Sequence, residues 1–252
     1  MNKIYFDNAA TTEISDKVIS VIMDTMKNNY GNPSSTHSFG RNSKSILELS
    51  RKFIADKLKA KANEIIFTSG GTESNNMIIK SVVESQNIER IITTKIEHKA
   101  VLNSIESISK TKKILVEYLD VDNCGNPNIK QFKNSLEKSN QLTLVSLMHI
   151  NNEIGTIIDL NEYGKICRSN NALFHSDTVQ TIGHYDLDLS NTTIDFITCS
   201  AHKFHGPKGV GFAYINNETI INPFIEGGSQ ERGYRGGTES IHNILGLKTA
   251  FE

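Results

Sequence analysis

The chain has 252 residues, of which 37% are hydrophobic and 22% charged, and its formal net charge is −1 at pH 7. This length allows a substantial buried core, and the near-neutral charge excludes the basic surplus expected of a protein that binds nucleic acid or an anionic membrane. No apolar run approaches the roughly 20 residues of a membrane span, and MNKIYFDNAATT lacks a signal-peptide core, so a cytoplasmic protein is expected.

The first part of the chain predicts two helices joined by a long polar loop. An apolar segment at 4–6 leads into the polar stretch 7–12, and Ser15 is placed to cap a helix that follows it. The stretch 31–40, GNPSSTHSFG, predicts a loop, either a plain solvated connection or an ordered functional loop. A second helix is predicted at about 41–60. The apolar residues expected to face inward are Val18, Ile19, Ile22 and Met26 in the first helix and Ile46, Leu49, Phe53 and Leu58 in the second.

From Glu64 onward, strand and helix patterns alternate. Apolar strand patterns occur at 65–67, 90–94, 113–119, 142–149, 172–175, 196–197 and 210–215. Helical patterns lie between most of them, and a further amphipathic helix begins near Ile241. Repeated strand–helix units of this kind predict a three-layer α/β fold, in which a mostly parallel sheet carries helices on both faces.

Polar side chains follow five of these strands. In a parallel sheet the carboxyl ends of the strands meet at one edge, which is where open α/β sheets bind ligands. Each residue has a simpler explanation of its own, such as a helix cap for Thr72, a turn for Asn152 or a solvated surface position for Lys203. Their common placement favours a binding site. The residues are Thr72, His98, Asn152, Asp177, Gln180, Ser200, His202 and Lys203.

One cofactor chemistry uses all of these side chains. The stretch 68–74, TSGGTES, lacks the Lys of a Walker loop, but a glycine turn at a helix start suits a phosphate monoester. Lys203 could form a Schiff base with an aldehyde, and Asp177 could keep a pyridinium nitrogen protonated. His98 is placed to lie over a ring or to move a proton near it. The pattern therefore points to a small phosphorylated cofactor such as pyridoxal 5′-phosphate.

Motifs along nearly the whole chain resemble those of the cysteine desulfurases, the class V aminotransferase branch of the fold-type I pyridoxal phosphate enzymes, related to NifS and IscS. They occur in the family's order, and several are specific to the desulfurases. The motifs are DNAATT, GNPSSTHSFG, TSGGTESNN, IEHKAV, HINNEIGTI, HSDTVQTIG, SAHKFHGPKGVG and GGSQERGYRGGTES. The resemblance implies the large cofactor-binding domain of a pyridoxal phosphate transferase.

The resemblance also implies a role for each matching residue. Lys203 would carry the cofactor as a Schiff base, His98 would stack on its ring and assist proton transfer, and Asp177 would pair with the ring nitrogen. Thr238, in RGGTES, matches the residue that reaches the phosphate from the other subunit, which implies a homodimer. The remaining residues implied are Gly71, Thr72, Ser200 and His202 for the phosphate, and Asn152 and Gln180 for the ring substituents.

The sequence departs from the family pattern after Lys203. In desulfurases a nucleophilic cysteine and a substrate-binding arginine lie far downstream of the lysine, whereas this sequence ends at Glu252. We therefore expect residues 1–15 to be a segment associated with the small domain, residues 16–252 to form the large domain, and the C-terminal small domain to be absent. The chain would then be a shortened or truncated desulfurase that does not turn over alone.

Three cysteines offer no substitute for that nucleophile. Cys124, Cys167 and Cys199 are widely spaced and form no CxxC pair, which argues against a disulfide framework and a structural zinc site. Each is expected to be a buried or incidental thiol. His202 and His205, even with His175 nearby, make a poor zinc set, so no metal is expected.

Three functions remain open from the sequence. The resemblance implies a desulfurase that converts L-cysteine to L-alanine and passes the sulfur, as an enzyme-bound persulfide, to an acceptor or scaffold protein for iron–sulfur cluster or thiocofactor assembly. A second hypothesis is another class V reaction, such as selenocysteine lysis or transamination, which the same lysine and aspartate could support. A third is a chain that binds the cofactor or dimerises without turnover. Neither a nucleic acid nor a membrane is expected as partner.

Overall fold

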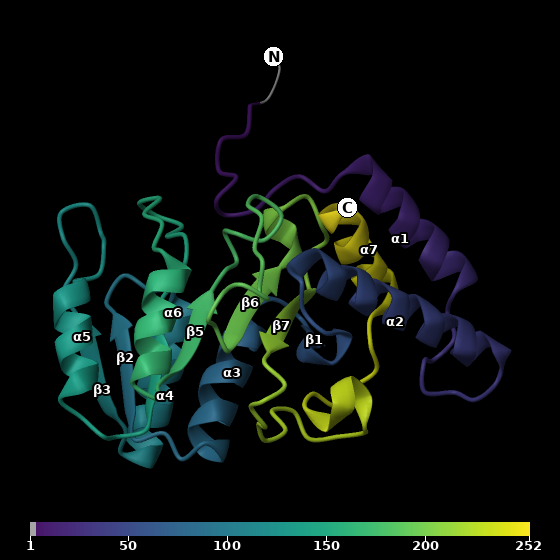
Figure 1. The fold of residues 1–252 in the computed structure, drawn as a ribbon. Coiled ribbons are helices and arrows are strands. Elements are labelled where there is room, and N and C mark those ends of the chain that lie inside the picture. The colour runs from purple at the N-terminus through teal and green to yellow at the C-terminus, as the bar shows by residue number, and fades with distance from the viewer. Residues whose placement is uncertain (1–3) are drawn as a thin grey trace.

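A seven-stranded sheet forms the centre of the computed structural model, which describes residues 4–252 (Figure 1). The strands are β1 (Ile65–Thr68), β2 (Arg90–Thr94), β3 (Leu115–Leu119), β4 (Thr143–Ser146), β5 (Leu173–Asp177), β6 (Phe196–Ser200) and β7 (Gly211–Ile215). The α-helices are α1 (Asp16–Asn28), α2 (Ser38–Leu58), α3 (Gly71–Ser85), α4 (Lys99–Lys112), α5 (Ile129–Glu137), α6 (Leu160–Ser169) and α7 (Ile241–Phe251). Short 3₁₀ turns are η1 (Ala62–Glu64), η2 (Ala201–Lys203) and η3 (Gln230–Gly233).

The strand order is β1-β7-β6-β5-β4-β2-β3, and the predicted mostly parallel sheet is confirmed. Strands β3, β2, β4, β5 and β6 pair in parallel, whereas β7 lies antiparallel between β6 and β1. A short connection allows β7 to return directly beside β6, because antiparallel neighbours need no helical crossover. Since β7 is antiparallel to both neighbours, β1 and β6 run in the same direction. The carboxyl ends of β1, β2, β4, β5 and β6 therefore share one edge.

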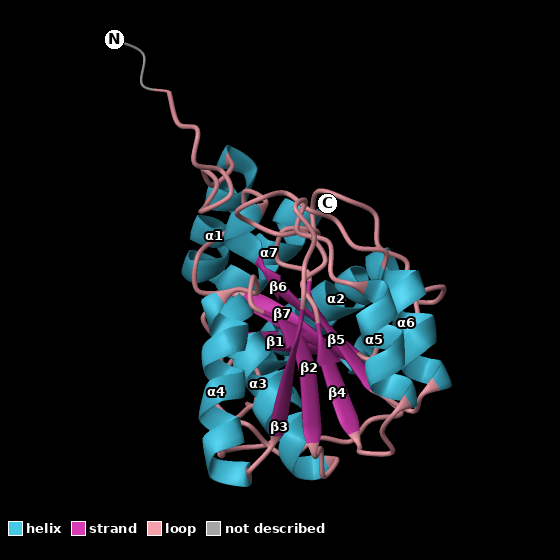
Figure 2. Cartoon of the chain, turned by 90° about the vertical axis from the view of Figure 1, so that its left-hand side faces the viewer, coloured by secondary structure: helices cyan, strands magenta, loops and turns pink. Residues whose placement is uncertain are grey.

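Helices cover both faces of the sheet, as the sequence predicts (Figure 2). One face packs against α3 and α4 through an apolar cluster that includes Met77 and Ile105. The other face packs against α2, α5, α6 and α7, with Phe132 and Leu247 in its core. The strands alternate between the two layers: Phe196 belongs to the first and Ile197 to the second. Burial on both faces explains why strands read as nearly continuous apolar runs.

The inward faces predicted for the first two helices are partly wrong. In α1, Val18 is buried, but Ile19 and Met26 are 38% and 58% exposed. In α2, Leu49 is 64% exposed, and the inward positions are shifted to residues such as Leu47 and Ile54. The physical reason for α1 is that it packs on α7 and not on the sheet, so only a narrow stripe is covered. That packing is close, since a Cβ on Gly246 would lie 2.8 Å from Ile22 Cδ1.

A buried ion pair fixes the segment before α7 to the edge of the sheet. Arg51, in α2, donates two hydrogen bonds to the Glu231 carboxylate at 2.7 and 2.8 Å, and both side chains are almost fully buried. Glu231 also accepts from the Phe67 backbone N–H at 2.8 Å, and Arg51 donates to Ile65 O at 2.7 Å. Breaking a buried pair leaves an uncompensated charge and is strongly destabilising.

Replacement of Arg51 by alanine is expected to lower the free energy of unfolding by about 3–5 kcal/mol, because Glu231 would remain buried without its partner. The neighbouring Lys52 pairs with Asp56 on the surface, and Lys52→Ala should cost at most about 1 kcal/mol. Denaturant unfolding curves of the two variants provide the measurement. Equal midpoints for both variants would contradict the structural role assigned to the buried pair.

Candidate active site

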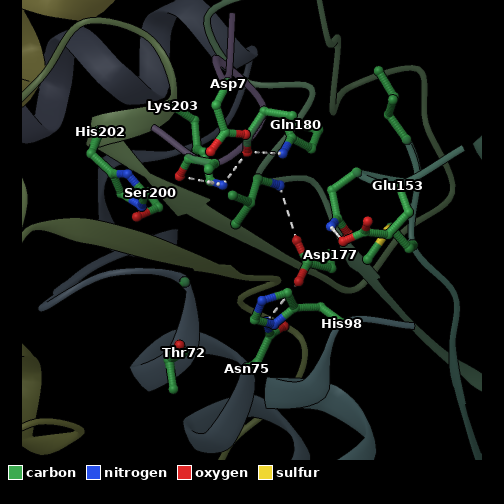
Figure 3. Close-up of a pocket in the computed structure, with 17 residues that line it drawn as sticks. Asp7, Thr72, Asn75, His98, Glu153, Asp177, Gln180, Ser200, His202 and Lys203 are labelled. Atoms are coloured by element: carbon green, nitrogen blue, oxygen red, sulfur yellow. Dashed lines mark hydrogen bonds between the residues drawn. The ribbon is translucent and has the colours of Figure 1, made fainter. Parts of the chain in front are cut away.

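A cavity of about 440 Å³ lies at the shared carboxyl edge of the strands (Figure 3). It brings together every residue named for the site from the sequence except Thr238. The predicted residues that line it are Gly71, Thr72, His98, Asn152, Asp177, Gln180, Ser200, His202 and Lys203. Residues that the sequence reasoning did not select also line it, and the polar ones are Asp7, Asn75 and Glu153.

The start of α3 forms the end of the cavity suited to a phosphate. Gly70 has φ +141°, a conformation that favours glycine, and the helix begins at the next residue. A Cβ on Gly71 would lie 2.7 Å from Val179 Cγ2 and 3.7 Å from Ser200 Cβ, so glycine keeps the helix start close to β6 and the turn after β5. The helix N-terminus and the Thr72 and Ser200 hydroxyls give this end the donor set that a phosphate monoester requires.

Asp177 is the last residue of β5 and is only 4% exposed. Its Oδ2 accepts a hydrogen bond from Asn75 Nδ2 at 2.7 Å, and its Oδ1 accepts from the Val179 backbone N–H at 3.0 Å. These two donors fix a carboxylate at the cavity wall, where it can pair with a cationic ring nitrogen. The sequence analysis did not select Asn75 as a site residue. Asn75 lies one helical turn after Gly71 and therefore on the same side of α3.

Lys203 follows β6 in the short turn η2 and reaches the same cavity. Its Nζ donates to the backbone carbonyls of Ala9 and of Ala10, the latter at 2.9 Å. Burial lowers the pKa of Lys203, although the carboxylates of Asp177 and others nearby act in the opposite direction. A lowered pKa increases the share of neutral amine, which is the form that attacks an aldehyde.

The N-terminal segment crosses the cavity beside η2. Thr12 donates through its backbone N–H to His202 O at 2.9 Å, and Ser15 donates in the same way to His205 O at 3.1 Å. The described part of the predicted 1–15 segment is thus tied to the sheet edge, and Figure 1 shows it running along that edge. Residues 1–3 of that segment lie outside the described part of the chain. These contacts join residues nearly two hundred positions apart, which no local pattern could indicate.

The remaining predicted side chains surround the cavity. His98 caps α4, its Nδ1 accepts from the Ala100 backbone N–H at 3.1 Å, and its ring is exposed to the cavity. Gln180 donates to Ala9 O at 2.9 Å. The His202 ring nitrogen Nδ1 lies 3.1 Å from Thr11 Oγ1. Burial lowers the pKa of His202, and the positive charge of Lys203 acts in the same direction, which favours the neutral imidazole.

Thr238 lies outside this cavity. It is exposed, on the loop between η3 and α7, and lines a separate small cavity next to β1. The loop is held by Arg235, which pairs with Glu73 of α3 at 2.7 Å. Within one chain, therefore, Thr238 takes no part in the site formed by Lys203 and Asp177.

The three cysteines differ in exposure. Cys167 and Cys199 are buried, and burial raises the pKa of both thiols well above the ordinary value. Cys124 is exposed, in the turn before α5. Because the thiolate is the reactive form, neither buried cysteine can act as a nucleophile at neutral pH.

A thiol reagent should therefore label the folded chain at Cys124 alone. Denatured chain should take up label at all three cysteines, and Cys124→Ser should remove the fast reaction of the folded form. The measurement is the time course of thiol modification with and without denaturant. Fast labelling of Cys199 in folded protein would contradict the burial described.

Two further features bear on function. In residues 4–252 there is no group of three or more His, Cys, Asp or Glu side chains arranged to hold a metal ion. Over the same residues, no helix combines the length and the apolar character required to cross a bilayer.

The sheet topology, the edge cavity with its lysine and aspartate, and the glycine turn at a helix start define a fold-type I pyridoxal phosphate protein. The chain belongs to the aminotransferase class-V family, which it matches over residues 4–252. Enzymes of this family depend on pyridoxal 5′-phosphate, and the donors around the cavity fit that cofactor.

Among its relatives, the cysteine desulfurase IscS of Dictyoglomus turgidum is 44% identical over 99% of this chain and 63% of its own length. A solved NifS-like protein superposes with a TM-score of 0.94 at 40% identity, covering 99% of this chain and 69% of that one. The structure of SspA in complex with cysteine gives a TM-score of 0.93 at 33% identity, covering 99% and 72%. The chain spans about 63–64% of the length of the first curated relatives it matches.

Proposed function

We propose that this chain forms the cofactor-binding part of a cysteine desulfurase, with Lys203 carrying the cofactor and Asp177 facing its ring nitrogen. The observation that carries the proposal is the single cavity that the Lys203 amine and the Asp177 carboxylate line together, with the α3 start at its phosphate end. The family match and the desulfurase relatives support the same assignment. When bound, pyridoxal phosphate supplies an electron sink for the substrate Cα.

Different residues of the chain would then bind and orient different parts of the cofactor. Asp177 holds a proton on the ring nitrogen, because its fixed carboxylate stabilises the cationic form. His98 would lie over the ring and would be the side chain placed to move a proton beside it. The residues proposed for the phosphate are Gly71, Thr72, Ser200 and His202, and those proposed for the ring substituents are Asn152 and Gln180.

The substrate proposed is L-cysteine, with L-alanine and persulfide sulfur as products. The name of the IscS relative and the cysteine complex of SspA support this choice. We also propose a homodimer in which Thr238 reaches the cofactor phosphate of the partner. Support comes from its exposed position on an anchored loop, away from the cavity of its own chain. A cytoplasmic acceptor or scaffold protein would receive the sulfur for iron–sulfur cluster or thiocofactor assembly.

The experiment is an amino-acid titration of the cofactor-loaded chain followed by its visible absorption. L-cysteine is expected to change the spectrum at lower concentration than other natural amino acids, because the proposed substrate binds at the cofactor. Free pyridoxal phosphate titrated with the same amino acids is the control, because the amine and thiol of cysteine also react directly with the free aldehyde. Preference for L-selenocysteine or for an amino donor such as glutamate would instead favour another class V reaction.

A further inference from the structure

Beneath Asp177 lies a buried polar layer that the proposed function does not use. It sits between the sheet and helix α3, on the face whose neighbouring core residues are apolar. His175, Ser146 and Thr198 are fully buried in this layer, and Asn75 is 1% exposed. Buried polar groups are costly unless they are hydrogen-bonded, so such a cluster requires a physical reason.

Strand register places these side chains on one face. His175 pairs with Phe196, which belongs to the α3 and α4 side of the core, and Ser146 pairs with His175. Asp177 follows two residues after His175 and pairs with Thr198, so it shares that face. Asn75 reaches the same face from α3 and donates to Asp177 (Figure 3).

Three groups of this layer have no hydrogen-bond partner among the described protein atoms: His175 Nε2, Asn75 Oδ1 and Thr198 Oγ1. The first two belong to side chains that carry a second polar atom. The other atoms of the same side chains are satisfied: His175 Nδ1 lies 2.9 Å from Ser146 Oγ, and Asn75 Nδ2 donates to Asp177. Each side chain therefore presents one fixed end and one unmatched end to the same buried layer.

The unmatched ends of His175 and Asn75 are chemically complementary. Burial lowers the pKa of His175 to about 3, so its imidazole is neutral at physiological pH and carries one proton. If the Ser146 hydroxyl donates to Nδ1, that proton is on Nε2, which is then a donor. Asn75 Oδ1 is an acceptor. A single enclosed water can join a donor to an acceptor in a polar buried site.

We propose that His175 is a positioning residue for Asp177, linked through one enclosed water to Asn75 Oδ1. Ser146, His175, the water and Asn75 then form a directed chain of hydrogen bonds that ends on the Asp177 carboxylate. Its effect is to fix the orientation of the Asn75 amide, since a rotated amide would turn its oxygen toward the carboxylate. This inference rests on the proposed role of Asp177 at the cofactor ring.

Two substitutions of similar size separate this role from simple packing. Glutamine at position 175 can place its terminal amide near the Nε2 position but not at Nδ1, whereas asparagine reaches only the Nδ1 position. His175→Asn is expected to weaken cofactor binding about tenfold, which corresponds to the loss of one buried hydrogen bond to a charged network. His175→Gln should remain within about threefold of the parent chain.

The readouts are the dissociation constant of pyridoxal phosphate and the pH midpoint of the bound cofactor's visible absorption. The midpoint should move in His175→Asn and stay in His175→Gln, while the melting temperature of the cofactor-free chain reports packing alone. Equal behaviour of the two variants in both cofactor readouts would overturn the proposal. Loss of cofactor in Asp177→Asn together with unchanged binding in His175→Asn would also overturn it, and would leave the proposed function intact.

A measurement on the unaltered chain does not depend on the folding of any variant. In ¹⁵N-histidine-labelled protein, the His175 ring should show a proton on Nε2 at neutral pH and should not titrate above about pH 4. The signal is assigned by its absence from the spectrum of His175→Gln. A proton on Nδ1 would overturn the proposed direction of the chain.

Discussion

Replacing Lys203 with alanine is expected to abolish covalent attachment of pyridoxal phosphate. The half-buried amine points into the cavity and has a pKa lowered by burial, so it is the group placed to condense with the aldehyde. Without it, the cofactor would keep only its non-covalent contacts, and its dissociation constant should rise at least about 100-fold. The measurement is equilibrium dialysis combined with visible absorption after incubation with cofactor.

Lys208 provides a matched control for this change. It is exposed, lies five residues further along the same connection and does not line the cavity. Lys208→Ala should retain the colour and the affinity of the parent chain. An unchanged cofactor affinity in Lys203→Ala, or a loss of affinity in Lys208→Ala, would show that the amine has been assigned to the wrong residue.

Asp177→Asn is expected to have the second largest effect. Asparagine keeps the size of the side chain but removes the negative charge that Asn75 and Val179 hold at the cavity wall. A cationic ring nitrogen would lose its partner, and Asn75 would face a second amide. We expect the affinity for the cofactor to fall about 10–100-fold and the absorption of any bound cofactor to indicate an unprotonated ring nitrogen.

The exposed Asp186, which does not line the cavity, is the control for charge alone. Asp186→Asn changes the net charge by the same amount and should leave binding unaltered. The comparison uses fluorescence or absorbance titrations of both variants at the same ionic strength. Similar affinities for the two variants would contradict the placement of Asp177 against the ring.

Much of the fold follows from local sequence pattern. Strand β2 begins and ends at the bounds predicted for it, and the Ser15 side chain caps α1 by accepting a hydrogen bond from the Val18 N–H. The carboxyl edge then gathers the predicted polar residues because parallel strands must end together. The prediction was wrong where tertiary packing decides, as for Leu49, which faces solvent although its spacing suits the inward side of α2.

The parts of the site that escaped prediction depend on contacts between distant segments. Helical spacing puts Asn75 on the same side of α3 as Gly71, but its hydrogen bond to Asp177 forms only because α3 packs beside the end of β5. The carbonyls of Ala9 and Ala10 become partners of Lys203 only when the N-terminal segment crosses the sheet edge. Backbone carbonyls carry no side-chain identity, so no residue pattern could have indicated them.

Borohydride reduction of the cofactor-loaded chain, followed by peptide mass analysis, tests the assignment of the lysine most directly. Reduction makes the bond between an amine and the cofactor aldehyde permanent and marks the residue that formed it. We expect the added mass of a reduced cofactor on the peptide that contains Lys203 and on no other lysine. A labelled peptide elsewhere, or no labelled peptide from a yellow protein, would contradict the account.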